Sequence, residues 1–161
     1  MSRNGRSEDS AVPAEGPVKP PPAGFGITID QVRDFEFRIR FDREGLADLM
    51  TDEPPPHGGG AAPNPSQLLA AAVGNCLAAS LVFAARKARL GLNALHAEVN
   101  TAYTRNERGR LRIGRIDVRI DPEFAAGDEG RVQRVLDLFE DFCVVTQSVK
   151  HGVEIGVQVR R

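Results

Sequence analysis

One apolar stretch, Leu68–Ala85, constrains the fold more than any other feature of this 161-residue chain. Before it, Asn64 suits a helix N-cap and Pro65 suits the first helical position. After it, Gly91 suits a helix stop that follows a basic last turn. The sequence therefore predicts a helix over Pro65–Leu90. Because this helix is apolar on nearly every side, we expect it to be covered from several directions. Polar and small residues interrupt the stretch, which favours a buried core helix over a membrane span.

The segments around this helix alternate between apolar and polar residues with the period of a β-strand. They are 27–29, with 30–34 as a connection, then 35–42, a hairpin over 95–120 and a last strand over 153–159. A change of phase at Gly114–Arg115 predicts a bulge in the hairpin. A second helix is expected after Gly127–Gly130, with Cys143 at its end on an apolar line. Strands segregated from helices indicate an α+β fold with antiparallel sheets.

Composition separates the chain into two parts. Residues 1–24 are rich in Pro, Gly, Ser and charged residues, which predicts a disordered tail before a single domain over 25–161. The chain has 21 basic and 22 acidic residues and no Trp. We therefore expect neither a nucleic-acid partner nor binding to a membrane surface. Since the tail contains no apolar run of the kind that a secretion signal needs, a cytoplasmic location is expected.

The chain has two cysteines, Cys76 in the long helix and Cys143 in the second. They lie 67 positions apart (143 − 76) without a CxxC pattern, so they do not form a zinc motif. The three histidines are scattered, and we expect no metal and no cofactor. The spacing of the two cysteines leaves two interpretations open: two buried structural thiols, or one redox pair that the fold brings together.

The amino-acid sequence around the two cysteines favours the interpretation as a redox pair. Asn64–Leu77 (NPSQLLAAAVGNCL) resembles the central-helix signature of the OsmC/Ohr family, the osmotically inducible and organic hydroperoxide resistance proteins. Asp141–Val149 (DFCVVTQSV), followed by Gly152 and Val153, resembles the second signature of that family. The resemblance extends over residues 25–159, and the two signatures occur in the expected order.

The resemblance implies a fold and an activity. The fold would have antiparallel sheets wrapped around two long central helices in an intertwined homodimer. Peroxidase members attack an organic hydroperoxide with the helix cysteine, here Cys76, which becomes a sulfenic acid. The second cysteine, here Cys143, would then close a disulfide that an external dithiol reduces. The chain would thus be a cysteine-based peroxidase with both cysteines catalytic.

One position departs from the peroxidase pattern. Ser66 stands where peroxidase members carry a Glu that pairs with a thiolate-stabilising Arg, and the candidates for that Arg here are Arg38 and Arg40. Because a hydroxyl cannot form that ion pair, Ser66 favours an alternative: a non-peroxidatic protein of the same family that binds an apolar ligand. A structural homodimer with two inert thiols is the remaining alternative.

Overall fold

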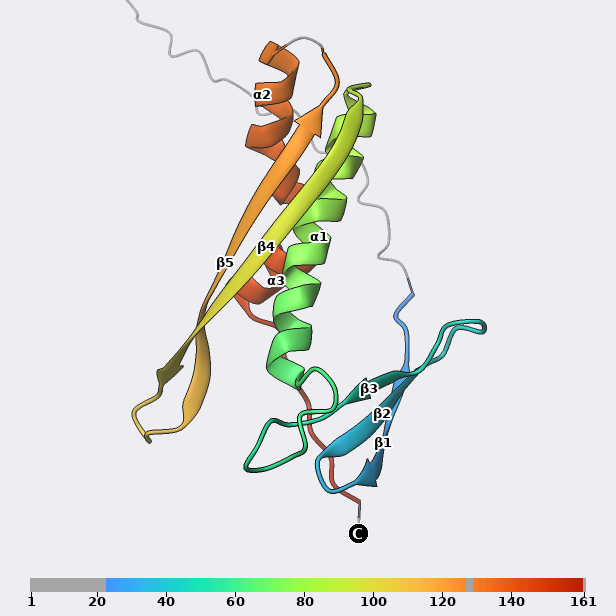
Figure 1. The fold of residues 1–161 in the computed structure, drawn as a ribbon, viewed down its shortest axis with the longest axis vertical. Coiled ribbons are helices and arrows are strands. Elements are labelled where there is room, and N and C mark those ends of the chain that lie inside the picture. The colour runs from blue at the N-terminus through green and yellow to red at the C-terminus, as the bar shows by residue number, and fades with distance from the viewer. Residues whose placement is uncertain (1–22, 127–128, 161) are drawn as a thin grey trace, which may run out of the picture.

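The computed structural model describes residues 23–126 and 129–160, and it has the predicted α+β fold (Figure 1). The predicted tail over 1–24 therefore lies outside the described residues except for 23 and 24. Two antiparallel sheets, of order β1-β2-β3 and β4-β5, accompany the helices. The elements are β1 (Ile27–Arg33), β2 (Glu36–Phe41), β3 (Leu49–Thr51), α1 (Pro65–Lys87), β4 (Leu92–Arg105), β5 (Leu111–Phe124), α2 (Glu129–Leu138), the 3-10 helix η1 (Phe139–Phe142) and α3 (Val144–His151).

Helix α1 begins where the sequence predicts. Asn64 Oδ1 accepts a hydrogen bond from the Gln67 backbone at 2.9 Å, and Gln67 Oε1 accepts one from the Asn64 backbone at 2.9 Å. This reciprocal capping box satisfies two of the free amides at the helix start. The helix ends three residues earlier than expected, since Arg89 rather than Gly91 takes the left-handed conformation, with φ of 55°.

Helix α1 lies at the centre of the molecule. The β4–β5 hairpin crosses one side, while α2, η1 and α3 pack on another (Figure 1). Leu81 is only 1% exposed, and a Cβ at Gly74 would run into Cγ2 of Val99 on β4, so the helix and the hairpin are in close contact. By length and composition alone α1 could cross a membrane, but the core helix of a globular domain passes the same test.

The hairpin carries the predicted bulge. Its register runs from Ala102 opposite Arg115 to Tyr103 opposite Ile113, which leaves Gly114 unpaired. In the first sheet, β1 continues through the stretch that the sequence analysis assigned to a connection, and the turn comes at Asp34, which has φ of 41°. The three-residue strand β3 was not predicted.

Two other elements differ from the sequence-based prediction. The second helix is not continuous through Cys143: it ends at Leu138, continues as η1, and α3 begins at Val144. The predicted last strand over 153–159 is absent, and Ile155 in this segment is 82% exposed. A strand requires a neighbour that accepts and donates its backbone hydrogen bonds, and the described part of this single chain provides none for this segment.

Candidate active site

Cys76 lies halfway along α1 and is partly exposed. It packs beside a buried cluster to which the hairpin and η1 also contribute; the core of that cluster is Val73, Leu77 and Cys143. The surroundings of the Cys76 sulfur are therefore mostly apolar, as the sequence predicted. Its partial exposure leaves it reachable from outside, unlike a structural cysteine in a sealed core.

Cys143 occupies the junction between η1 and α3, where its side chain caps the N-terminus of α3. The sulfur is fully buried. It accepts a hydrogen bond from the Thr146 backbone N–H at 3.4 Å, and it lies 2.9 Å from Thr146 Oγ1. The N-terminus of a helix carries a partial positive charge, so this position favours a thiolate.

The structure brings the two cysteines together. Both are free thiols; Cys76 packs against the buried cluster that contains Cys143, and the two sulfurs interact. The backbone N–H of Val145, in the first turn of α3, also interacts with Cys76. The first turn of α3 thus provides one backbone N–H for each of the two sulfurs.

The pKa values of the two thiols move in opposite directions. Burial, then the interaction with the Cys143 side chain and the charge of that sulfur, raises the pKa of Cys76 above its ordinary value. Burial would also raise the pKa of Cys143, but interactions with Cys76, with the hydroxyl and backbone N–H of Thr146 and with Ser80 outweigh it and lower that pKa. These directions, together with the place of Cys143 at the N-terminus of α3, favour Cys143 as the first of the two thiols to ionise.

Ser80 and Thr146 belong to this site, and the sequence analysis did not assign either of them a role. The two residues are 6% and 7% exposed; Thr146 Oγ1 lies 2.9 Å from the Cys143 sulfur, and Ser80 interacts with both thiols. A signal was present for Ser80, which lies four residues after Cys76 and so on the same helix face. For Thr146 the only signal was its place three residues after Cys143, which becomes informative once Cys143 is known to be an N-cap.

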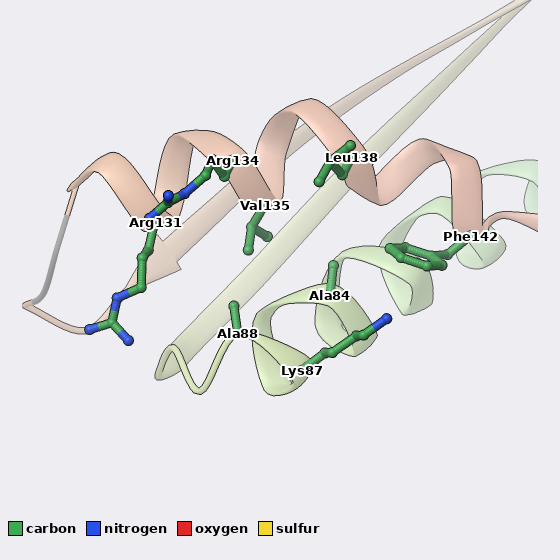
Figure 2. A pocket seen from close by; sticks show the side chains of 8 residues that line it. All are labelled: Ala84, Lys87, Ala88, Arg131, Arg134, Val135, Leu138 and Phe142. Atoms are coloured by element: carbon green, nitrogen blue, oxygen red, sulfur yellow. The ribbon is translucent and has the colours of Figure 1, made fainter. Parts of the chain in front are cut away.

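An apolar pocket of about 310 Å³ opens between α1 and α2 (Figure 2). Ala84, Ala88, Val135, Leu138 and Phe142 supply its apolar wall, with cationic side chains from both helices around it. Lys87 Nζ lies 5.3 Å from the centre of the Phe142 ring, within cation–π range. Phe142 directly precedes Cys143 in the chain, but neither cysteine lines this pocket.

The other candidates from the sequence lie elsewhere. Arg38 forms an ion pair with Asp48 at 3.7 Å and Arg40 forms one with Asp30. Both arginines are on β2, in the sheet that lies beyond the N-terminal end of α1 (Figure 1). Ser66 is in the first turn of α1, roughly 15 Å along the axis from Cys76 at 1.5 Å per residue. Within residues 23–126 and 129–160, no three His, Cys, Asp or Glu side chains gather as a metal site would require.

Comparison with known proteins identifies the family. Residues 58–158, which include both cysteines, match the family model described as OsmC-like protein. The match covers more than half of the chain, so this protein belongs to the OsmC-like family, as the two motifs predicted. No curated relative matches the chain by sequence.

Solved structures share the fold. An OsmC-like protein of unknown function from Vibrio cholerae superposes with a TM-score of 0.69 at 15% identity, covering 80% of this chain and 94% of the other. An organic hydroperoxide resistance protein from Legionella pneumophila gives 0.59 at 15% identity, with 80% and 90% covered. The organic hydroperoxide resistance protein OhrB of Bacillus subtilis gives 0.55 at 20%, with 80% and 91% covered. These likenesses establish the OsmC-like fold.

Proposed function

We propose that this protein is a thiol peroxidase that reduces organic hydroperoxides with Cys76 and Cys143. The observation that carries the proposal is that the fold packs the two free thiols into one cluster, with Cys76 partly exposed and Cys143 buried. A disulfide requires Cα atoms within about 7 Å of each other, and two thiols that share one cluster and interact are placed to form one. Membership of the OsmC-like family supports the same chemistry.

The reaction would proceed in two steps. The Cys76 thiolate attacks the outer peroxide oxygen, the O–O bond breaks, and the alkoxide leaves and is protonated to the alcohol. The Cys143 thiolate then attacks the sulfenic acid on Cys76, and hydroxide leaves as water once protonated. Two thiols and one hydroperoxide thus give one disulfide, one alcohol and one water. An external dithiol would restore the reduced pair, which suits a reducing compartment such as the cytoplasm.

The surroundings favour an organic substrate over hydrogen peroxide. The side chains packed with Cys76 are mostly apolar, so an organic group beside this sulfur would lie in apolar surroundings. Burying such a group is worth about 25 cal/mol per Å² of apolar surface. Hydrogen peroxide has no apolar surface to bury and would not gain this contribution.

We also propose that the protein acts as a homodimer. One face of α1 carries apolar side chains that the described residues do not cover; Phe83 is 53% exposed although it contacts Phe142 edge-on. The segment over 153–159 keeps its alternating apolar pattern but has no partner strand within residues 23–126 and 129–160. A second copy could cover both surfaces, which a single chain leaves in water at a hydrophobic cost.

Counting thiols tests the redox proposal. Reduced protein is treated with one equivalent of cumene hydroperoxide, unfolded and titrated with a thiol reagent. We expect a loss of two thiols per chain in the wild type and of none in Cys76→Ala. In Cys143→Ala we expect one oxidised sulfur that cannot close a disulfide. If the wild type keeps both thiols, the peroxidase proposal is wrong.

A second function, binding of an apolar ligand without redox chemistry, is favoured by one observation. The pocket in Figure 2 combines an apolar wall with side chains of Lys87, Arg131 and Arg134, a lining that suits an amphipathic anion. Retention of both thiols after peroxide, together with saturable binding of an anionic fluorescent probe that Val135→Trp abolishes, would support this function. Retention of the thiols without such binding would leave a structural homodimer with inert thiols.

A further inference from the structure

The thiol pair belongs to a polar cluster of four side chains inside the apolar core: Cys76 and Ser80 from α1, and Cys143 and Thr146 from the start of α3. Three of the four residues are at least 93% buried. Among the described residues no buried side-chain nitrogen or oxygen lacks a hydrogen-bond partner. Buried hydroxyls are costly unless they are paired, and the partner of Thr146 Oγ1 is the Cys143 sulfur at 2.9 Å.

The two sulfurs differ in the number of groups with which they interact in this cluster. Cys143 interacts with the Thr146 backbone N–H, the Thr146 hydroxyl, the Ser80 hydroxyl and the Cys76 thiol. Cys76 interacts with the Val145 backbone N–H, with Ser80 and with the Cys143 sulfur. A thiolate on Cys143 would therefore accept more hydrogen bonds than one on Cys76. None of these stabilising groups is a charged side chain.

We propose that Ser80 and Thr146 are positioning residues that hold the negative charge of the reduced pair on Cys143, so that Cys143 acts as the base for Cys76. This inference rests on the proposed peroxidase function and deepens it. It assigns Cys143 two roles in succession: acceptor of the Cys76 proton, and the thiolate that closes the disulfide. It also explains how the pair ionises although Arg38 and Arg40 form ion pairs elsewhere in the chain.

Every proton is accounted for in the reaction steps that follow from this role of Cys143. As hydroperoxide reaches Cys76, the thiol proton passes to the Cys143 sulfur and the Cys76 thiolate attacks the outer oxygen. The O–O bond breaks, and the alkoxide takes the proton from the Cys143 thiol and becomes the alcohol. Cys143 is then a thiolate beside a sulfenic acid on Cys76. It attacks that sulfur, and the hydroxide that leaves takes a proton from solvent and becomes water.

Titration of the reduced protein tests the charge assignment without peroxide. Thiolate absorbance near 240 nm is followed against pH in the wild type, Thr146→Val, Ser80→Ala, Cys76→Ala and Cys143→Ala. Removing one hydrogen bond to a thiolate should raise the first apparent pKa of the pair by about one unit in Thr146→Val and in Ser80→Ala. Thr146→Ser should restore the wild-type curve, and Ser148→Ala, on the same helix, should not change it. Cys143→Ala should lose the low-pKa thiolate altogether, whereas Cys76→Ala should keep a thiolate with a raised pKa.

Single-turnover oxidation separates this inference from the function on which it rests. With cumene hydroperoxide, Thr146→Val and Ser80→Ala should slow disulfide formation by about tenfold near neutral pH and approach the wild-type rate at high pH. Unchanged titration curves in both hydroxyl variants, or a low-pKa thiolate that survives in Cys143→Ala, would overturn the inference even in an active peroxidase. Shifted curves without any thiol oxidation in the wild type would instead refute the peroxidase function. Should Thr146→Val fail to fold, as judged by circular dichroism, the titration and oxidation of Ser80→Ala still test the inference.

Discussion

Two regions of the molecule differ in how completely they enclose their apolar side chains. Helix α1, the β4–β5 hairpin and α2–α3 surround a core in which Leu81 and Ala85 are 1% exposed. The β1–β3 sheet and the segment over 153–159 leave most of their large apolar side chains in solvent, with Ile29 at 57%. The thiol cluster lies in the enclosed region, so one chain suffices to set its geometry. The open region carries the surface that we propose a second copy covers.

The largest expected effect concerns the open region. Ile155→Asp together with Val157→Asp should convert the proposed dimer to a monomer, because two charges would have to be buried in the interface. Light scattering at micromolar concentration measures the change. Gln158→Asp, a charge in the same segment, serves as the matched control and should leave the dimer intact. A wild-type protein that is already monomeric would contradict the proposed dimer and leave the open region without an explanation.

In the enclosed region, Leu81→Ala should lower the free energy of unfolding by about 2–5 kcal/mol, since it removes buried methyl groups and leaves a cavity. Leu46→Ala, at a half-exposed position between β2 and β3, should change it by about 0.5 kcal/mol or less. Urea unfolding of both variants measures the difference. Equal losses at the two positions would mean that the contrast between the regions does not exist in solution.

Gly74→Ala should destabilise the protein by about 1–3 kcal/mol, because the new methyl group meets Val99. Helix propensity alone predicts the opposite sign, a gain of about 1 kcal/mol on replacing Gly in a helix. Packing should therefore outweigh propensity here. Val99→Ala in the same chain removes the clashing atom, so the double variant should lose less stability than the sum of the single variants. Additive losses would show that the helix and the hairpin are not in such close contact.

The pH dependence of stability should reveal the charge on Cys143. Its folded pKa is lowered from the ordinary value of 9.0, so the folded state holds this proton less tightly than the unfolded chain. The free energy of unfolding gained from this group is present above pH 9 and is lost as pH falls through the folded pKa. Under reducing conditions, the difference in the free energy of unfolding between the wild type and Cys143→Ala should therefore increase as the pH rises from that lower pKa to 9. A flat difference in urea midpoints over this window would contradict the lowered pKa.

The smallest effect is expected at the N-terminus. The composition of residues 1–24 predicts that limited proteolysis removes them without changing the melting temperature or the thiol count. Calorimetry before and after trimming measures this. A clear drop in melting temperature would mean that the tail packs on the domain and would add a third region to the comparison.

Much of the fold follows from the sequence because its signals are local. The start of α1 depends on Asn64, Pro65 and Gln67, which cap the helix whatever lies around it. The bulge at Gly114 follows from a change in alternation that can be read along one strand. The last strand was wrongly predicted because the alternation over 153–159 indicates a strand-forming segment but says nothing about whether a partner strand is available.

The sequence by itself determined the α+β class, the long central helix, the OsmC-like family and the two cysteines as the reactive candidates. Only the tertiary structure decided what surrounds the sulfurs. The second helix breaks at Leu138, which makes Cys143 the cap of α3 and brings Thr146 and the amides of that helix to the thiols. Ser80 reaches Cys143 only because α1 packs against that junction. A pKa depends on the hydrogen bonds and burial around a group, and in this protein those come from segments more than sixty residues apart.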